Sequence, residues 1–260
     1  MKPKALVLRA AGTNCDRETA YALEVAGFEA QRVHVFRVME QPDLLREFQF
    51  LLFPGGFSYG DDIASGKILA NQMLHRLAGP LNDFVAAGKL VLGICNGFQI
   101  MIKSGLLPWG KVAPGEAHKD ATLAWNDCGQ FLDRWVHLRA DSDRCVFLPK
   151  GQVIALPVAH GEGKFVPASD TVLDTLHRQD QVALRYVDAA GNPGGFPVNP
   201  NGSVDDIAAI CDPTGRVMGL MPHPERFVDV TQHPQWTRGG VQQADGQIFF
   251  RQAFDFLKQA

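Results

Sequence analysis

The 260-residue sequence lacks the short motifs by which many enzymes hold nucleotides or metal ions. It contains no GxxxxGK[ST] phosphate loop, no GxGxxG after its first apolar run and no HExxH. Its five cysteines are odd in number and lack CxxC spacing, so the sequence favours neither a disulfide framework nor a zinc site. We therefore expect no metal ion and no cofactor on this chain, and a reducing compartment, the cytoplasm, as its location.

The sequence also lacks a strong charge excess and a long apolar run. Its 25 basic and 28 acidic residues give a formal charge of −3, which provides no electrostatic basis for binding nucleic acid or an anionic membrane. No apolar stretch approaches the roughly 20 residues needed to span a bilayer, and the N-terminal segment lacks the apolar region and cleavage site of a signal peptide. We expect a soluble, unexported protein with neither nucleic acid nor membrane as a partner.

Strand and helix patterns alternate through the first half of the chain. The expected strands are residues 5–8, 32–36, 48–53 and 89–94, and the expected helical segments are residues 17–26, 65–77 and 80–87. This order indicates an α/β fold with a mostly parallel central sheet and helices on both faces, as in flavodoxin-like proteins.

The second half of the chain has a different pattern. Its expected extended segments are residues 131–140, 152–158, 181–187, 208–211 and 217–221, the last two forming a hairpin, and residues 245–258 are an expected helix. These segments indicate antiparallel additions to the sheet in the C-terminal half. No repeat or linker interrupts the sequence, so we expect a single domain over residues 1–260.

An apolar run ending in Gly93-Ile-Cys95-Asn-Gly97 is followed at once by helical periodicity. Small residues on both sides of a nucleophile allow the strained strand-to-helix turn known as a nucleophile elbow. The helix N-terminus at such a corner stabilises an anion, which suits a reactive thiolate. The alternative is a buried structural cysteine, a common use of this residue.

A cysteine nucleophile needs a base, and the base needs an orienting partner. Among the eight histidines, His223 stands between two prolines at the end of an apolar strand and is followed two residues later by the carboxylate of Glu225. Residues two apart in an extended segment lie on the same side, so the two side chains can be neighbours. A rigid surface turn in which His223 is incidental explains the spacing equally well.

Acyl transfer also needs donors for an oxyanion. The N–H groups of Gly56, in a glycine-rich loop after an expected strand, and of Asn96, directly after the cysteine, could form such an oxyanion hole. The alternative is that Gly55-Gly56 only makes a turn.

Several motifs together resemble the glutamine amidotransferase subunits of phosphoribosylformylglycinamidine synthases, within the class I glutamine amidotransferases. They are Gly12-Thr-Asn-Cys-Asp16, Pro54-Gly-Gly-Phe-Ser-Tyr-Gly-Asp61, Gly93-Ile-Cys-Asn-Gly-Phe-Gln99, Ala159-His-Gly-Glu-Gly-Lys-Phe165, Asn199-Pro-Asn-Gly-Ser203 and Met221-Pro-His-Pro-Glu-Arg226. The Gly-x-Cys-x-Gly and His-x-Glu framework is shared by the whole class, whereas Cys95-Asn-Gly-Phe-Gln99, His160-Gly-Glu-Gly163 and Asn199-Pro-Asn-Gly-Ser203 together are typical of the purine-pathway member.

The resemblance implies that Cys95 attacks the side-chain amide of glutamine, that His223 protonates the departing ammonia and that Glu225 holds the imidazole. It implies that Gln99, one helical turn after the cysteine, hydrogen-bonds the substrate. It also implies that the backbone near His160 and Gly161 contacts the amino-acid end of glutamine.

The partners implied by the resemblance are L-glutamine, a separate synthetase subunit that uses ATP and Mg²⁺ to make formylglycinamidine ribonucleotide, and a small accessory subunit. Residues 228–246 match no motif and are either an insertion at the partner interface or a surface loop.

Three rival interpretations each conflict with a feature of the sequence. A cysteine hydrolase or chaperone with the same elbow usually has histidine directly after the cysteine, where this chain has Asn96. An amidotransferase of another pathway, such as GMP or CTP synthesis, leaves Asn199-Pro-Asn-Gly-Ser203 unexplained. A catalytically silent scaffold of the same fold leaves the retention of Cys95, His223 and Glu225 unexplained.

Overall fold

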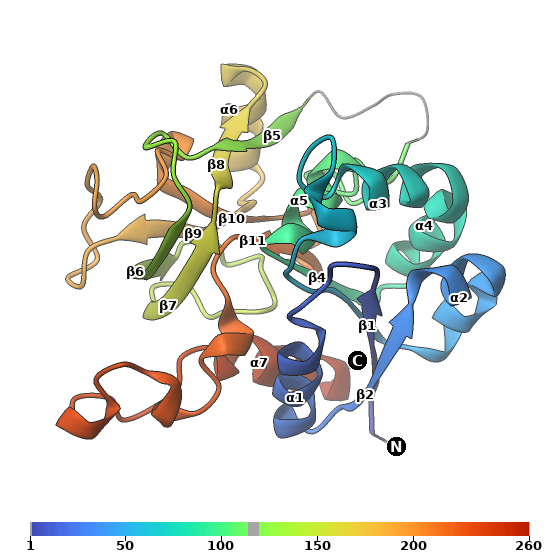
Figure 1. Ribbon diagram of the computed structural model, residues 1–260, viewed down its shortest axis with the longest axis horizontal. Coiled ribbons are helices and arrows are strands. Elements are labelled where there is room, and N and C mark those ends of the chain that lie inside the picture. Colours follow the sequence, from blue (N-terminus) through green and yellow to red (C-terminus); the bar gives the residue numbers. More distant parts are fainter. Residues whose placement is uncertain (1, 114–119, 260) are drawn as a thin grey trace.

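A large central sheet runs through the computed structural model, which describes residues 2–113 and 120–259 (Figure 1). Its strand order is β2-β1-β3-β4-β11-β10-β9-β6-β7. The strands are β1 (Lys4–Arg9), β2 (Glu29–His34), β3 (Phe50–Phe53), β4 (Leu90–Ile94), β6 (Leu132–Ala140), β7 (Val153–His160), β9 (Val182–Val187), β10 (Ile207–Cys211) and β11 (Val217–Leu220).

The first five strands in this order are parallel, and the remaining four are added by antiparallel pairing. The pairs β1–β2, β1–β3, β3–β4 and β4–β11 are parallel. From β11 onward the pairs β10–β11, β9–β10, β6–β9 and β6–β7 are antiparallel. The order β2-β1-β3-β4-β11 is that of flavodoxin-like sheets. The predicted parallel sheet with antiparallel additions in the C-terminal half is confirmed, as is the hairpin between β10 and β11. That residues 1–260 make one domain stays a prediction.

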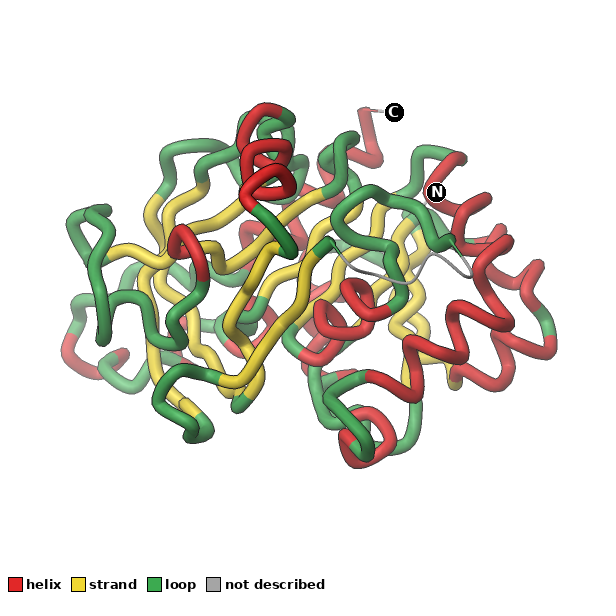
Figure 2. The backbone as a smooth tube through the Cα atoms, turned by 90° about the horizontal axis from the view of Figure 1, so that it is seen from above, coloured by secondary structure: helices red, strands yellow, loops and turns green. Residues whose placement is uncertain are grey.

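Helices cover both faces of the parallel part (Figures 1 and 2). The helices are α1 (Asp16–Ala26), α2 (Val35–Glu40), α3 (Lys67–Gln72), α4 (Ala78–Ala86), α5 (Asn96–Lys103), α6 (Asp170–Arg178) and α7 (Gln247–Gln259). Helix α1 packs beside α7, and α5 packs beside α3 and against β3, β4 and β11. None of the helices in residues 2–113 and 120–259 has the length and apolar character needed to cross a membrane.

Two of the predicted boundaries are wrong. The second strand ends at His34, because this residue caps α2 by accepting a hydrogen bond from the backbone N–H of Phe36 at 3.3 Å. The two helical segments expected between residues 65 and 87 are joined, since a π-helical turn over Met73–Leu77 connects α3 directly to α4.

Three elements lie outside the predictions. Strands β5 (Ala121–Trp125) and β8 (Glu162–Pro167) pair with each other in a separate two-stranded sheet. Helix α6 follows β8 and begins after Ser169, whose side chain accepts a hydrogen bond from the N–H of Val172. The small sheet matters for function because the turn between β7 and β8 reaches the cysteine.

Residues 228–246, the segment that matches no motif, consist of turns and two short 3₁₀ helices, Val230–Gln232 and Trp236–Arg238. It projects from the sheet as the orange and red extension in Figure 1. His233 anchors it, with its ring centroid 4.4 Å from that of Trp135. A role for this segment at a partner interface stays a prediction.

Candidate active site

Cys95 stands at the corner between β4 and α5, where the elbow motif predicts a strained turn. Its backbone has φ 52° and ψ −107°, a conformation that costs a non-glycine residue about 1–3 kcal/mol. A Cβ on Gly97 would lie 1.8 Å from the carbonyl oxygen of Phe53, and one on Gly93 would lie 2.2 Å from the sulfur of Met101. The flanking glycines are therefore required by the close approach of α5 to the sheet.

His223 and Glu225 follow β11, the strand directly beside β4, so that chain segments about 130 residues apart in sequence meet at one edge of the sheet. The backbone N–H of His223 donates to the carbonyl of Pro157 at 2.9 Å. Its Nδ1 lies 2.6 Å from Oε1 of Glu225, and the two side chains are 1% and 0% exposed. This geometry leaves Nε2 of the imidazole as the free edge of the ring.

The protonation of His223 reflects several opposing influences. Burial lowers the pKa of an imidazole because it disfavours the charged form, but the carboxylate of Glu225 and the sulfur atoms of Cys95 and Cys15 raise it. The net result is a pKa of His223 well above its ordinary value. The pair is suited to hold a proton close to Cys95.

The two predicted oxyanion donors come from the loop after β3 and from the start of α5. Gly56 follows β3, adopts φ +140° and lines the same pocket as Cys95. A Cβ on Gly56 would lie 2.7 Å from the backbone nitrogen of Asn14, so a larger residue does not fit there. Asn96 is the first residue of α5, where a backbone N–H has no partner within its helix. Both N–H groups are suitable donors for an oxyanion.

A pocket of about 260 Å³ opens beside Cys95. Its lining residues come from the loop after β3, from α5 and from the turn between β7 and β8. They are Gly56, Phe57, Asp61, Ser65, Cys95, Gln99, Trp125, Phe131, Ala159, His160, Gly161 and Glu162. The volume lies slightly below the lower end of the range for small-molecule sites, roughly 300 Å³, which suits a small ligand.

Gln99 lines this pocket, but its amide is already bonded within the protein. Its Nε2 donates to the carbonyl of Glu162 at 2.6 Å, and its Oε1 accepts from Nδ2 of Asn96 at 2.9 Å. The same Asn96 side chain accepts from the N–H of Ser58 and donates to Asp61. Gln99 therefore ties α5 to the turn after β7, and its oxygen retains one lone pair for a substrate donor.

His160 lines the pocket, is almost fully buried and is uncharged at neutral pH. Burial and the nearby His223 lower the pKa of His160 to about 3. Its Nδ1 lies 3.0 Å from Oδ1 of Asn126, whose Nδ2 donates to the carbonyl of His160. The N–H of Asn126 donates to the carbonyl of Gly161 at 2.9 Å. The side chain and backbone of Asn126 thus hold the segment at His160 and Gly161, which is predicted to contact the substrate.

The Asn199-Pro-Asn-Gly-Ser203 motif supports the next part of the same turn. Nδ2 of Asn201 donates to the carbonyl of Gly163 at 2.8 Å, and Oγ of Ser203 accepts from the N–H of Phe165 at 2.9 Å. The motif thereby fixes the start of β8 behind the pocket.

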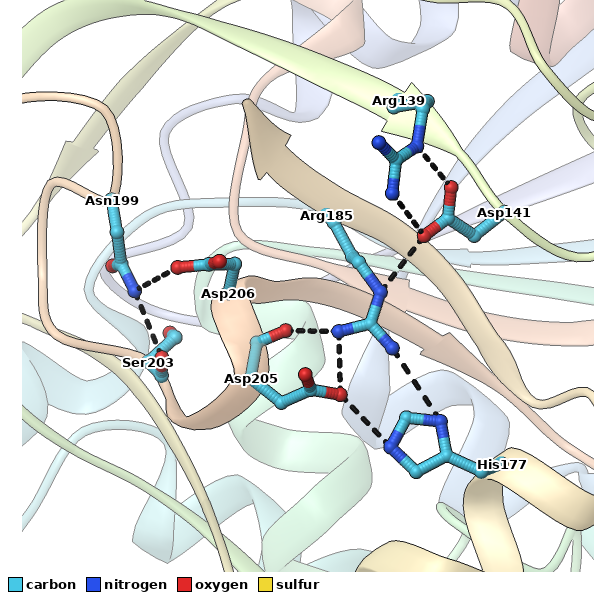
Figure 3. Close-up of polar contacts among 8 residues, drawn as sticks. All are labelled: Arg139, Asp141, His177, Arg185, Asn199, Ser203, Asp205 and Asp206. Atoms are coloured by element: carbon cyan, nitrogen blue, oxygen red, sulfur yellow. Dashed lines mark hydrogen bonds and ion pairs between the residues drawn. The ribbon is translucent and has the colours of Figure 1, made fainter. Parts of the chain in front are cut away.

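A hydrogen bond and ion pairs connect Asn199 and the residues that follow the motif to their neighbours (Figure 3). Asn199 donates to Asp206 at 2.8 Å, while Asp205 pairs with Arg185 at 2.5 Å and with His177 at 2.9 Å. Asp205 and Asp206 both have positive φ, 54° and 55°, a left-handed conformation that aspartate adopts more readily than most non-glycine residues. The hydrogen bond and the ion pairs therefore fix the left-handed turn that follows the motif.

Some residues of the site were missed by the sequence reasoning. Asp61 and Glu162 place two carboxyl groups at the pocket, and burial raises the pKa of Asp61. Both lie in quoted motifs, Asp61 at the end of the Pro-Gly-Gly loop and Glu162 after His160-Gly161, but no spacing rule assigned them a role. Cys15 was missed too, because its neighbours in space are distant in sequence.

Cys15, His223 and Glu225 place one potential metal ligand each within 4.8 Å of one another. Such a set of sulfur, nitrogen and oxygen donors is acceptable to zinc. The guanidinium of Arg226, however, donates from Nη2 to the sulfur of Cys15 at 3.1 Å. A second cation would have to share the sulfur with this guanidinium, so the residues fit a metal ion poorly.

Comparison with known proteins shows the family. Residues 2–257 match the family model of the CobB/CobQ-like glutamine amidotransferase domain. The chain is 42% identical over 261 residues to the phosphoribosylformylglycinamidine synthase subunit PurQ of Dehalococcoides mccartyi, covering 99% of each chain. It is 40% identical over 269 residues to the PurQ subunit of Archaeoglobus fulgidus, covering 98% of this chain and 97% of that one.

A solved structure agrees with these matches. The chain superposes on one from the structure of PurLQS from Thermotoga maritima with a TM-score of 0.75 and 33% identity, covering 99% of this chain and 100% of that one. The chain therefore belongs to the family of CobB/CobQ-like glutamine amidotransferase domains and, within it, to the PurQ subunits of phosphoribosylformylglycinamidine synthase.

Proposed function

We propose that this chain is the glutaminase subunit of a phosphoribosylformylglycinamidine synthase. It hydrolyses L-glutamine to glutamate and ammonia, and it supplies the ammonia to a synthetase subunit that makes formylglycinamidine ribonucleotide in purine biosynthesis. The observation that carries the proposal is the strained Cys95 next to the buried His223–Glu225 pair, at the ends of adjacent parallel strands. Full-length similarity to PurQ subunits supports the pathway.

In the first step, the sulfur of Cys95 attacks the side-chain amide carbon of glutamine. The negative charge that develops on the amide oxygen is stabilised by the N–H groups of Gly56 and Asn96, each worth about 2.7–4 kcal/mol in comparable sites. His223, held by Glu225, donates its proton to the departing nitrogen. The C–N bond breaks, ammonia leaves and a γ-glutamyl thioester remains on Cys95.

In the second step, water resolves the thioester. The now neutral His223 accepts a proton from the attacking water, and the C–S bond breaks to release glutamate and return the sulfur of Cys95. Substrate contacts come from Gln99 and from the backbone around His160 and Gly161. The carboxyl groups of Asp61 and Glu162 suit the α-ammonium group of an amino acid at the same pocket.

The ammonia needs an acceptor on another subunit. In this proposal a separate synthetase uses ATP and Mg²⁺, and a small accessory subunit completes the assembly, while this chain binds no cofactor of its own. The relative from Thermotoga maritima was solved as PurLQS, which supports a complex with a synthetase. A cytoplasmic location stays a prediction from the cysteine content.

The experiment is a comparison of wild type and Cys95→Ala in the complex reconstituted with the synthetase. The variant should lose glutamine-dependent amidination and keep the ammonia-dependent reaction, because the synthetase chemistry does not need the thiol. Equal loss of both activities would assign Cys95 a structural role. We expect the isolated subunit to be a poor glutaminase, as family members are usually activated by their partner.

A silent scaffold is separated by labelling with a glutamine-analogue electrophile. The proposal predicts a single modified cysteine, Cys95, and protection by glutamine. A wild-type chain that resists the label and supports no glutamine-dependent reaction in the complex would contradict the proposed function.

A further inference from the structure

Cys15 is a second buried thiol beside the catalytic pair, and the reaction described above does not use it. It precedes α1 and is 0% exposed. Its sulfur lies within 4.8 Å of a ring nitrogen of His223 and of a carboxylate oxygen of Glu225. Both the sulfur and the His223 ring pack on the α-carbon of Gly55, where an added Cβ would lie 3.2 Å from Sγ and 2.9 Å from Cε1. The thiol is therefore part of the wall that fixes the imidazole.

The sulfur of Cys15 accepts a hydrogen bond from the guanidinium of Arg226. Its Nη2 donates to Sγ of Cys15 at 3.1 Å, and among the described residues it forms no ion pair with a carboxylate. Burial lowers the pKa of Arg226, but the nearby Cys15 and Glu225 raise it by more. The guanidinium is thus close enough to Glu225 to be influenced by its charge, while its hydrogen bond goes to the sulfur.

Only one of the two carboxylate oxygens of Glu225 is hydrogen-bonded among the described residues. Oε1 accepts from His223, whereas Oε2 is buried and has no hydrogen-bond partner among the described residues. Glu225 is close enough for its charge to influence Arg226, so a guanidinium that lost its sulfur acceptor would be drawn to this oxygen, because guanidinium–carboxylate pairs are among the strongest hydrogen bonds in proteins. Such a pair would compete with the imidazole for the carboxylate.

We propose that Cys15 is a positioning residue for the His223–Glu225 pair: its sulfur holds the guanidinium of Arg226 away from Glu225, so that the carboxylate serves His223 alone. The inference rests on the proposed glutaminase function. The charged or titratable groups that face His223 are Glu225, Cys15, Cys95 and His160. Cys15 is the one of these to which the proposed reaction gives no role.

The test uses Cys15→Ala in the complex reconstituted with the synthetase. We expect kcat for glutamine to fall roughly ten- to a hundredfold with little change in KM, the scale typical of misplaced catalytic groups. The alkaline limb of the pH–rate profile should move to lower pH, because a carboxylate shared with a guanidinium favours the imidazolium less. Cys15→Ser keeps a polar acceptor for Arg226, so its kcat and the position of its alkaline limb should lie between those of Cys15→Ala and wild type.

A rescue variant separates this role from simple packing. Adding Arg226→Met to Cys15→Ala removes the competing guanidinium, so kcat and the alkaline limb should return toward wild type. Cys211→Ala, which removes another fully buried thiol at the end of β10, is the matched control and should leave the pH profile unchanged.

The outcomes are distinguishable. A wild-type complex without glutamine-dependent activity would contradict the proposed function itself. An active wild type with an equally active Cys15→Ala would overturn the role of Cys15. A drop in kcat that Arg226→Met does not relieve, with an unshifted alkaline limb, would reduce Cys15 to a packing residue and also overturn it. If Cys15→Ala does not fold, Cys15→Ser alone decides by the same limb.

Discussion

Replacing Glu225 by glutamine tests the electrostatic core of the site. The carboxylate accepts from Nδ1 of His223 at 2.6 Å, and both side chains are almost completely buried. The substitution keeps the shape and removes the charge. Burial, which lowers the pKa of His223, then acts without its main opposing influence. The ring should lose its proton at a lower pH and become a poorer acid for the departing ammonia.

The magnitude follows from two effects. A hydrogen bond to a charged group is worth about 1.5–3 kcal/mol, which corresponds to roughly 10- to 150-fold in rate. The amide of Gln can also donate to Nδ1 and select the wrong tautomer of the ring, an effect that costs roughly 10⁴-fold in a serine-protease triad. We expect kcat for glutamine to fall between about 10² and 10⁴-fold. KM should change little, because Glu225 does not line the pocket.

The assay compares glutamine- and ammonia-dependent amidination by the reconstituted complex. The ammonia-dependent rate is the internal control for folding and assembly and should be unchanged. Glu225→Asp, which keeps the charge on a shorter side chain, should retain more activity than Glu225→Gln. A Glu225→Gln variant that turns over glutamine at the wild-type rate would refute the assignment of Glu225 as the partner of the catalytic imidazole.

Three further predictions concern stability and binding. Gly97→Ala would place its Cβ 1.8 Å from a carbonyl of β3 and should prevent stable folding, whereas Gly79→Ala, which meets nothing within 4 Å in α4, should be neutral or gain about 0.5–1 kcal/mol in urea unfolding. Asn201→Ala removes the 2.8 Å donor to the carbonyl of Gly163 and leaves it only the 3.5 Å bond from Oγ of Ser203, so we expect a loss of about 1–3 kcal/mol and a KM for glutamine raised more than kcat is lowered. The pKa of His160 is lowered from 6.5 to about 3 in the folded protein, so on acidification the imidazole is protonated in the unfolded chain at a higher pH than in the folded one. The free energy of unfolding should therefore fall by up to about 1.4 kcal/mol per pH unit below pH 6.5. Urea unfolding that shows no such slope in wild type relative to His160→Gln would contradict this.

The sequence predicts those parts of the fold that local patterns encode. The apolar run before Cys95 and the hairpin of residues 208–211 and 217–221 are each determined by neighbouring residues, and both appear as expected. Strands β5 and β8 are different, because each is short and pairs with a strand about 40 residues away. Helix α6 carries a local signal in the Ser169 cap, which an examination of capping residues could have found.

The site follows the same rule. Cys95, His223 and Glu225 are visible in the sequence because the elbow and the His-x-Glu spacing are local. The contact between Cys15 and Arg226 joins residues 211 positions apart, and no motif spacing connects them. The bond from Nε2 of Gln99 to the carbonyl of Glu162 likewise joins residues 63 positions apart, and it appears only when α5 and the turn between β7 and β8 come together. Positioning residues of this kind depend on tertiary structure.

The most direct test of the account is to trap the covalent intermediate. The complex turning over glutamine is quenched in acid, digested and analysed by mass spectrometry for a γ-glutamyl adduct. The account predicts the adduct on the peptide that contains Cys95, its absence from Cys95→Ala and no adduct on Cys15. Glutamine turnover by Cys95→Ala, or an adduct on any other cysteine of the wild-type chain, would contradict it.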